Sequence, residues 1–143
     1  MIVSRVDFYV LSASGELARL QFACRLAEKA YKLNNRVHIH VTGGDAAAKL
    51  DDLLWTFRDG SFVPHELLAG APEPEAPVTI GSDVLPSFDC DLLINLGDTV
   101  PAQANAFPRV AEIVTSDEDS RSRSRKRFVA YRDDGHALET HNL

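Results

Sequence analysis

The sequence predicts an α/β fold in which helices pack on both faces of a mostly parallel, doubly wound, Rossmann-like sheet. Short runs of β-branched and aromatic residues alternate with stretches of helical periodicity, and the segments between them are short. The chain has 143 residues, of which 45% are hydrophobic, so it is long enough to bury one continuous core. We therefore expect residues 1–143 to form a single domain.

The first half of the chain alternates strand and helix patterns. Residues 5–11 predict a strand, and residues 16–33 predict a helix because their apolar side chains recur every three or four positions. Residues 36–41 predict the next strand, and Asp45 is a favourable N-cap for a second helix. The core-facing residues expected in that helix are Ala46, Leu50, Leu53 and Phe57. Such short connections indicate βαβ units and a parallel sheet.

The second half begins with a proline-rich stretch, residues 69–77, which predicts an exposed loop because proline lacks a backbone donor. Residues 78–80 predict a short strand. Residues 91–96 are nearly all apolar, which is typical of a strand buried on both faces near the sheet centre. Residues 109–114 predict the last strand.

A final helix is predicted from Ser116 to about Tyr131, because serine followed by an acid three residues later is typical of a capped helix start. Residues 121–132 carry six of the fifteen lysines and arginines. At 100° per residue one stripe of this helix holds Arg121, Arg125, Phe128 and Arg132. Guanidinium groups beside an aromatic ring suit an acidic peptide that ends in an aromatic residue. A solvated basic helix is the alternative.

Composition excludes several classes of protein. The net charge of −6 argues against nucleic-acid binding by the protein surface as a whole. Cys24 and Cys90 have no Cys-x-x-Cys spacing for zinc or redox chemistry. No run of about 18 apolar residues and no signal-peptide pattern are present, so a cytoplasmic protein without membrane contact is expected.

Motifs for catalysis or cofactor binding are weak. The turn at residues 12–15 has one glycine, so it matches neither a dinucleotide-binding motif nor a P-loop, and Gly43–Gly44 reads better as a tight turn. His38 and His40 share a strand face but have no evident third metal ligand. Asp89 and Asp91 have no motif partner. We expect no catalytic residue, no cofactor and no metal.

A second segment with an excess of aromatic residues spans the end of the second helix and the loop after it. Trp55 lies off the core-facing stripe, and the loop residues Phe62, Val63 and Pro64 are not needed by the predicted core. Such residues anchor protein interfaces, and a small satellite core under the loop is the alternative.

These segments resemble the chi subunit of the bacterial DNA polymerase III holoenzyme. The resemblance rests on Leu-Asp-Asp-Leu-Leu-Trp at residues 50–55 and Ser-Phe-Val-Pro-His at residues 61–65. It continues in Ala-Pro-Val-x-Ile at residues 76–80, in the strand around residues 92–94, and in Arg-Phe-x-Ala-Tyr-Arg at residues 127–132. The matching segments extend over nearly the whole chain in the same order.

The resemblance implies a non-catalytic adaptor in DNA replication. Chi subunits belong to the clamp-loader complex, bind the psi subunit and the acidic C-terminal tail of single-stranded DNA-binding protein, and reach DNA only indirectly. The implied face for psi, and for a repair helicase, comprises Trp55, Phe62, Val63 and Pro64. The implied tail-binding residues are Val114, Arg121, Arg125, Phe128 and Arg132.

The chain departs from the family at the tail site. It has Thr115–Ser116 where chi subunits have proline and tyrosine, and Phe128 where they have tyrosine. Tail binding with a changed affinity is therefore expected.

Two other functions stay open on the sequence. One is a small nucleotide-binding or hydrolytic enzyme that uses Asp91, His38 and the Gly43–Gly44 turn. The other is direct binding of single-stranded DNA by the basic helix, with Phe128 stacking on bases.

Overall fold

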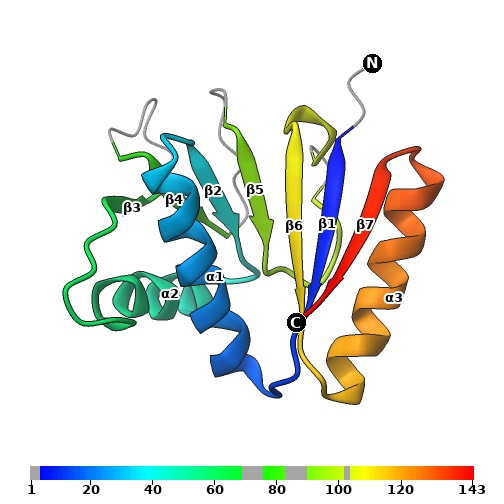
Figure 1. Cartoon of the computed structure of the whole chain (residues 1–143), viewed down its shortest axis with the longest axis horizontal. Coiled ribbons are helices and arrows are strands. Elements are labelled where there is room, and N and C mark those ends of the chain that lie inside the picture. The colour runs from blue at the N-terminus through cyan, green and yellow to red at the C-terminus, as the bar shows by residue number, and fades with distance from the viewer. Residues whose placement is uncertain (1–3, 69–75, 83–89, 102–103) are drawn as a thin grey trace.

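The computed structural model describes residues 4–68, 76–82, 90–101 and 104–143, which build a seven-stranded sheet with helices on both faces (Figure 1). The strands are β1 (Arg5–Val10), β2 (Val37–His40), β3 (His65–Leu67), β4 (Val78–Gly81), β5 (Leu92–Asn95), β6 (Arg109–Val114) and β7 (Ala137–Asn142). The helices are α1 (Glu16–Lys32), α2 (Gly44–Thr56), α3 (Glu118–Asp133) and the short 3-10 helix η1 (Ala104–Ala106). All neighbouring strands are parallel, in the order β3-β4-β2-β5-β6-β1-β7, so the predicted fold class is confirmed.

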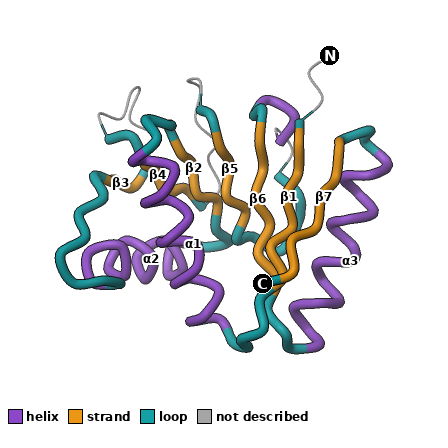
Figure 2. Tube along the Cα trace, viewed as in Figure 1, coloured by secondary structure: helices purple, strands orange, loops and turns teal. Residues whose placement is uncertain are grey.

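The sheet is wound in two directions from β1 and β6, which lie toward one edge. The chain leaves β1 through α1 toward β2, and leaves β6 through α3 toward β7 at the opposite side (Figure 2). The C-terminal ends of β1 and β6 therefore lie where the winding reverses, with α1 and α3 departing to opposite faces. Two backbone contacts join these ends, because Leu11 N–H donates to Val114 O at 2.8 Å and Ser116 N–H donates to Ala13 O at 2.9 Å.

Each face of the sheet has its own apolar core. On one face α1 and α2 pack on β2, β4 and β5, and Val37, Ile39 and Ile94 are fully buried there. Cys24 of α1 lies in this core, where burial raises the pKa of its thiol to about 12. On the other face α3 packs on β1 and β6, with Tyr131 fully buried. This two-sided burial explains why the central strands are almost continuously apolar.

Residues 109–114 form a strand, β6, as predicted, but they are not the last strand. The structure contains two strands that the sequence did not predict, β3 and β7. Strands β3 and β7 form the two edges of the sheet, and the residues of β7 are exposed or half-buried. Their order comes from parallel pairing with β4 and β1 rather than from an apolar pattern of their own.

Helix details differ from expectation by about one residue. In α2 the buried residues include Ala47 and Leu54, whereas the predicted Ala46 and Leu53 are only partly buried. Helix α3 is capped by Asp117, whose carboxylate accepts a hydrogen bond from Ser120 N–H at 3.3 Å. No helix in the described ranges is both long enough and apolar enough to span a membrane. Residues 69–75 of the predicted loop at 69–77, and Asp89, lie outside the described residues.

Candidate functional site

A small pocket with an apolar floor and a cationic rim lies between α3 and the strands beneath it. Its volume is about 190 Å³. The lining residues are Phe8 and Val10 of β1, Val114 of β6, Thr140 of β7, and Arg121, Ser124, Arg125 and Phe128 of α3. Four of the five predicted tail-binding residues are therefore brought together around one hollow.

The floor of this pocket is built by strand alternation and aromatic packing. Phe8 points toward α3, and its ring centroid lies 5.3 Å from that of Phe128 at an angle of 54°. The ring of Tyr131 lies 6.0 Å from Phe8, edge-on. Val114 is 4% exposed, so it contributes the base of the pocket rather than its rim. These contacts leave Phe128 half-buried, with part of its surface available to a ligand.

The rim of the pocket carries two exposed guanidinium groups. Arg125 Nη2 lies 2.9 Å from Glu118 Oε1, and both side chains are largely exposed. Among the described residues, Arg121 has no ion pair. Guanidinium groups bind carboxylates through paired hydrogen bonds, so the arrangement suits an anionic ligand with an apolar group.

Helix α3 is held on the sheet by a buried carboxylate that sequence reasoning missed. Glu112 of β6 is completely buried and accepts hydrogen bonds from Arg127 Nε at 2.8 Å and the Tyr131 hydroxyl at 2.6 Å. Asn95 Nδ2 donates a third hydrogen bond at 2.7 Å. Burial raises the pKa of the Tyr131 hydroxyl, and the negative charge of Glu112 raises it further. A lone glutamate in a strand pattern gives no signal of such a role.

The fifth predicted tail-binding residue, Arg132, lies away from the pocket lining. Its exposed guanidinium lies 3.5 Å from the carboxylate of Asp133. Helical periodicity places Arg132 on the same stripe as Arg125, but the pocket ends one turn earlier, at Phe128.

The second predicted surface is an exposed aromatic cluster at the end of α2. Trp55 and Phe62 are 55% and 62% exposed, and their ring centroids are 5.9 Å apart. His65 packs 4.7 Å from Trp55, and its Nε2 lies 3.1 Å from Asp51 Oδ1. Val63 is only 1% exposed and belongs to the core, so the prediction that it is left over for an interface is wrong.

The loop that follows α2 and carries Phe62 is fixed by Glu28 of α1. Its carboxylate lies 2.6 Å from Arg58 Nη2 and accepts a hydrogen bond from the Ser61 hydroxyl. The pKa of Glu28 is lowered chiefly by that hydroxyl and also by the charge of Arg58, against the opposing effect of burial. The neighbouring Phe62 is thus held outward by a defined loop.

The residues of the alternative hypothesis, a nucleotide-binding or hydrolytic enzyme, do not form a site. His38 is completely buried in mid-strand, with Nδ1 2.8 Å from Thr79 Oγ1. Asp91 precedes β5 and accepts a hydrogen bond from Arg36 N–H at 2.8 Å, whereas Gly43 follows β2. Because β2 and β5 are parallel, Asp91 and Gly43 lie at opposite ends of the sheet.

The glycine turn after β1 is filled by a side chain of the protein itself. Gly15 N–H donates to Asp117 Oδ1 at 3.2 Å. The pKa of Asp117 is lowered to about 2 by the hydrogen bond from the Thr115 hydroxyl and then by that from the Gly15 amide. A carboxylate that stays ionised therefore takes the place a phosphate would use, which argues against nucleotide binding there.

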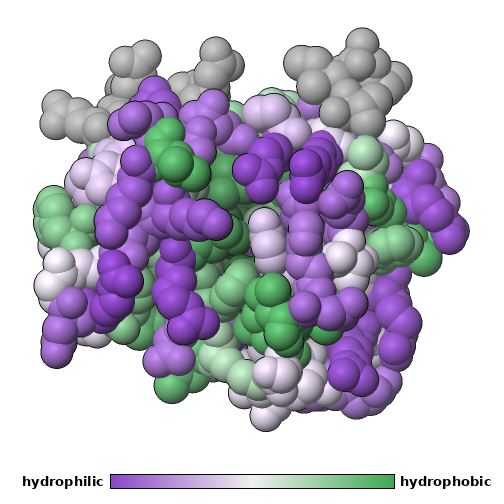
Figure 3. All heavy atoms as spheres, in the orientation of Figure 1, coloured by the Kyte–Doolittle hydropathy of each residue, from purple (hydrophilic) through white to green (hydrophobic). Residues whose placement is uncertain are grey.

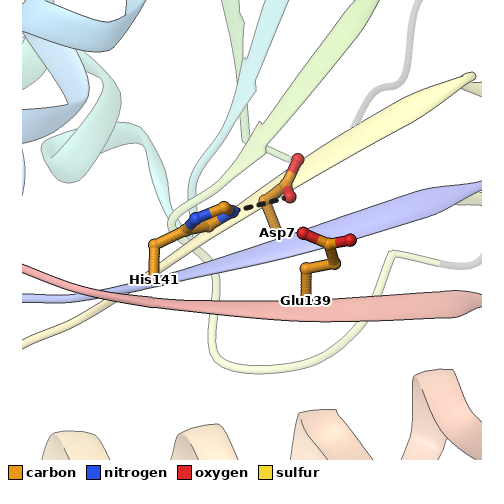
Figure 4. Close-up of side chains that lie close together, drawn as sticks. All are labelled: Asp7, Glu139 and His141. Atoms are coloured by element: carbon orange, nitrogen blue, oxygen red, sulfur yellow. Dashed lines mark hydrogen bonds and ion pairs between the residues drawn. The ribbon is translucent and has the colours of Figure 1, made fainter.

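A cluster of possible metal ligands joins residues from the two ends of the chain. Ligand atoms of Asp7, Glu139 and His141 lie within 4.8 Å of one another, on the part of the sheet that α1 and α2 leave uncovered (Figure 4). Hydrophilic side chains gather over this part in Figure 3. Asp7 also contacts Arg5 at 3.1 Å and Arg109 at 3.3 Å.

These contacts surround the Asp7 carboxylate with positive charge. Burial raises its pKa, but the hydrogen bond from His141 and the two arginines outweigh that effect and leave the pKa lowered. An ion pair network is thus sufficient to explain this cluster, and we assign no metal to it.

Comparison with known proteins identifies the family. Residues 3–139 match the model of the family described as DNA polymerase III chi subunit, HolC. The chain belongs to this family.

Curated relatives are similar over almost their whole length. The DNA polymerase III subunit chi of Pseudomonas aeruginosa is 41% identical over 141 residues, covering 99% of this chain and 98% of the relative. That of Escherichia coli is 33% identical over 143 residues, covering 96% and 97%. That of Haemophilus influenzae is 30% identical over 140 residues, covering 96% of both chains. The resemblance stated from the motifs is confirmed.

Solved structures of other proteins share the fold of this chi-family chain. The crystal structure of T4 UvsW has a TM-score of 0.68 at 7% identity, covering 98% of this chain and 41% of UvsW. Domain 2 of the DEAD-box helicase Mss116p, solved bound to an RNA duplex, has a TM-score of 0.64 at 13% identity, covering 96% and 64%. At such low identity the likeness concerns the fold alone.

The residues at which the sequence analysis expects a departure from the family lie at different places in the structure. Thr115 is 2% exposed and its hydroxyl donates to Asp117 at 2.6 Å, so it serves the start of α3. Neither Thr115 nor Ser116 lines the pocket, whereas Phe128 does. Of these positions, Phe128 is therefore the one at which an exchange alters the lining of the pocket.

Proposed function

We propose that this chain is a non-catalytic adaptor of the clamp-loader complex, which links the polymerase, through the psi subunit, to the acidic C-terminal tail of single-stranded DNA-binding protein. The observation that carries the proposal is the pocket beside α3, where Arg121 and Arg125 flank an aromatic floor. Membership of the chi family supplies the replication context.

The chemistry of the pocket suits the end of an acidic peptide. A carboxylate of the tail binds Arg125 or Arg121 through charge-assisted hydrogen bonds. An apolar terminal side chain fills the hollow of about 190 Å³ against Phe8 and Phe128. Because the guanidinium groups are exposed, tail binding is expected to weaken as salt rises.

The aromatic cluster is the proposed face for psi and for a repair helicase. Trp55 and Phe62 are exposed aromatic side chains in contact with each other, a composition typical of interface anchors. Pro64 is half-buried at their side, whereas the buried Val63 supports the loop from below.

The two surfaces lie far apart, at opposite edges of the sheet. The aromatic cluster borders β3 and the pocket borders β7, which are the first and last strands in the spatial order (Figure 1). We therefore propose that the two partners bind at the same time. Several tails on one protein-coated strand would then raise the effective concentration of the polymerase there.

Calorimetric titration tests the proposal. Wild type is titrated with a peptide copying the acidic tail, beside Arg125→Ala and the matched control Arg123→Ala, an exposed arginine of α3 that does not line the pocket. We expect salt-sensitive binding that Arg125→Ala lowers about tenfold or more and Arg123→Ala changes little. No binding to folded wild type at low salt would refute the proposed tail site.

A further inference from the structure

The cationic rim of the pocket is partly occupied by the protein itself. Arg125 Nη2 lies 2.9 Å from Glu118 Oε1, across two turns of α3, and the side chains are 67% and 78% exposed. At 100° per residue Glu118 lies at the N-terminal end of the stripe that holds Arg121 and Arg125. The carboxylate of Glu118 therefore uses the same guanidinium that faces the pocket.

We propose that Glu118 determines the affinity and the salt dependence of this pocket by competing with the ligand carboxylate for Arg125. The inference rests on the proposed function, since it concerns how an acidic peptide enters the same site. In the free protein Glu118 neutralises Arg125. When the peptide binds, its carboxylate replaces that of Glu118 and one ion pair is exchanged for another.

This exchange has two measurable consequences. Peptide binding breaks the ion pair between Glu118 and Arg125, so its stabilising free energy is lost. The displaced carboxylate of Glu118 then repels the other carboxylates of an acidic ligand. Exposed pairs of this kind contribute little, so removing the competitor is expected to tighten binding about two- to fivefold. Salt weakens both the pair that is lost and the pair that forms, so the competitor also flattens the salt dependence of wild-type binding.

The chain offers a matched control in the next residue. Asp119 lies in the same first turn of α3 but points toward a different hollow, which is also lined by Glu16 and Arg123. Glu118→Gln and Asp119→Asn remove the same charge and the same favourable interaction with the helix N-terminus. Only the first removes a partner of Arg125.

The experiment is a titration of wild type, Glu118→Gln and Asp119→Asn at several salt concentrations. The probe is a synthetic peptide of several aspartates ending in phenylalanine with a free carboxylate, and its C-terminally amidated form tests the need for that carboxylate. Circular dichroism and thermal unfolding establish that the two variants are equally folded. We expect Glu118→Gln to bind about two- to fivefold more tightly than wild type and with a steeper salt dependence.

The outcomes separate this inference from the proposed function. Equal affinities of Glu118→Gln and Asp119→Asn, or an unchanged salt dependence in Glu118→Gln, would overturn the competition by Glu118 alone. Failure of wild type and of both variants to bind at low salt would overturn the peptide site itself, and the competition with it.

Discussion

The hydroxyl of Tyr131 donates a hydrogen bond of 2.6 Å to Oε2 of Glu112, and both side chains are completely buried. Tyr131 belongs to the basic motif at the end of α3, whereas Glu112 lies in the middle of β6. The bond attaches the helix that carries the proposed peptide site to the centre of the sheet. We therefore expect both stability and peptide binding at the proposed site to depend on the same buried group.

Replacing Tyr131 by phenylalanine is expected to lower the free energy of unfolding by about 1–3 kcal/mol, because a hydrogen bond to a buried charged acceptor is lost. The ring keeps its contact with Phe8. Urea unfolding measures the change. Tyr31→Phe serves as the control, since Tyr31 is half-buried beside the α1 core and its hydroxyl has no hydrogen bond among the described residues. Equal losses in the two variants would refute the role of the hydroxyl.

Replacing Glu112 by glutamine is expected to lower the free energy of unfolding further, by about 3–5 kcal/mol, because it leaves the guanidinium of Arg127 buried without its counter-charge. Arg127 is 4% exposed and lies 2.8 Å from Glu112. Thermal and urea unfolding test this expectation, with Glu139→Gln as a control on an exposed carboxylate. A loss below about 1 kcal/mol would mean that the pair is weak despite its burial.

Phe62→Ala is expected to leave the stability of the isolated chain nearly unchanged, because the side chain is 62% exposed. The same substitution should weaken psi binding about tenfold or more if the aromatic cluster is the psi face. Trp55 is the only tryptophan, and it packs against Phe62, so its fluorescence reports on this surface directly.

The control for that experiment is Leu33→Ala, which removes another exposed apolar side chain, 65% exposed at the end of α1. Psi binding without a change in Trp55 fluorescence, or equal losses in Phe62→Ala and Leu33→Ala, would place the psi face elsewhere.

His38 predicts a loss of stability in weak acid. Burial, and then the nearby charge of His40, lower its pKa from 6.5 to about 4. His38 is therefore protonated below about pH 6.5 in the unfolded chain, but only below about pH 4 in the folded chain. This group leaves stability unaffected above that window and lowers it as pH falls through it, by about 2 kcal/mol at pH 5.

The measurement is urea unfolding of wild type and His38→Gln at pH 7 and pH 5, together with NMR titration of the imidazole. The glutamine variant should show a smaller loss between the two values, because it does not titrate. An imidazole that titrates near pH 6.5 in the folded protein would contradict the prediction.

Much of the fold was predictable because its central elements have local signatures. The helical periodicity of α1 and the apolar run of β5 each record a burial pattern within a few neighbouring residues. The edge strands β3 and β7 carry no such record. Their strand conformation depends on pairing with β4 and β1, the latter more than 120 residues away along the chain.

The proposed site was predictable only in part. The stripe of Arg121, Arg125 and Phe128 follows from helical geometry. The floor from Phe8 comes from the other end of the chain, and the exclusion of Arg132 depends on where the hollow stops. Likewise, the density of aromatic residues indicated a surface near Phe62 but could not show that its neighbour Val63 is buried.

The α/β class, the order of the central elements along the chain and the two motif segments of the family resemblance could be predicted without the structure, because each depends on residues close together in the chain. Three further roles depend on the folded arrangement: Glu112 anchors α3, Asp117 fills the glycine turn, and Glu118 contacts Arg125 at the pocket rim. Ionisable side chains acquire such roles from neighbours that folding supplies, and local pattern carries no information about those neighbours.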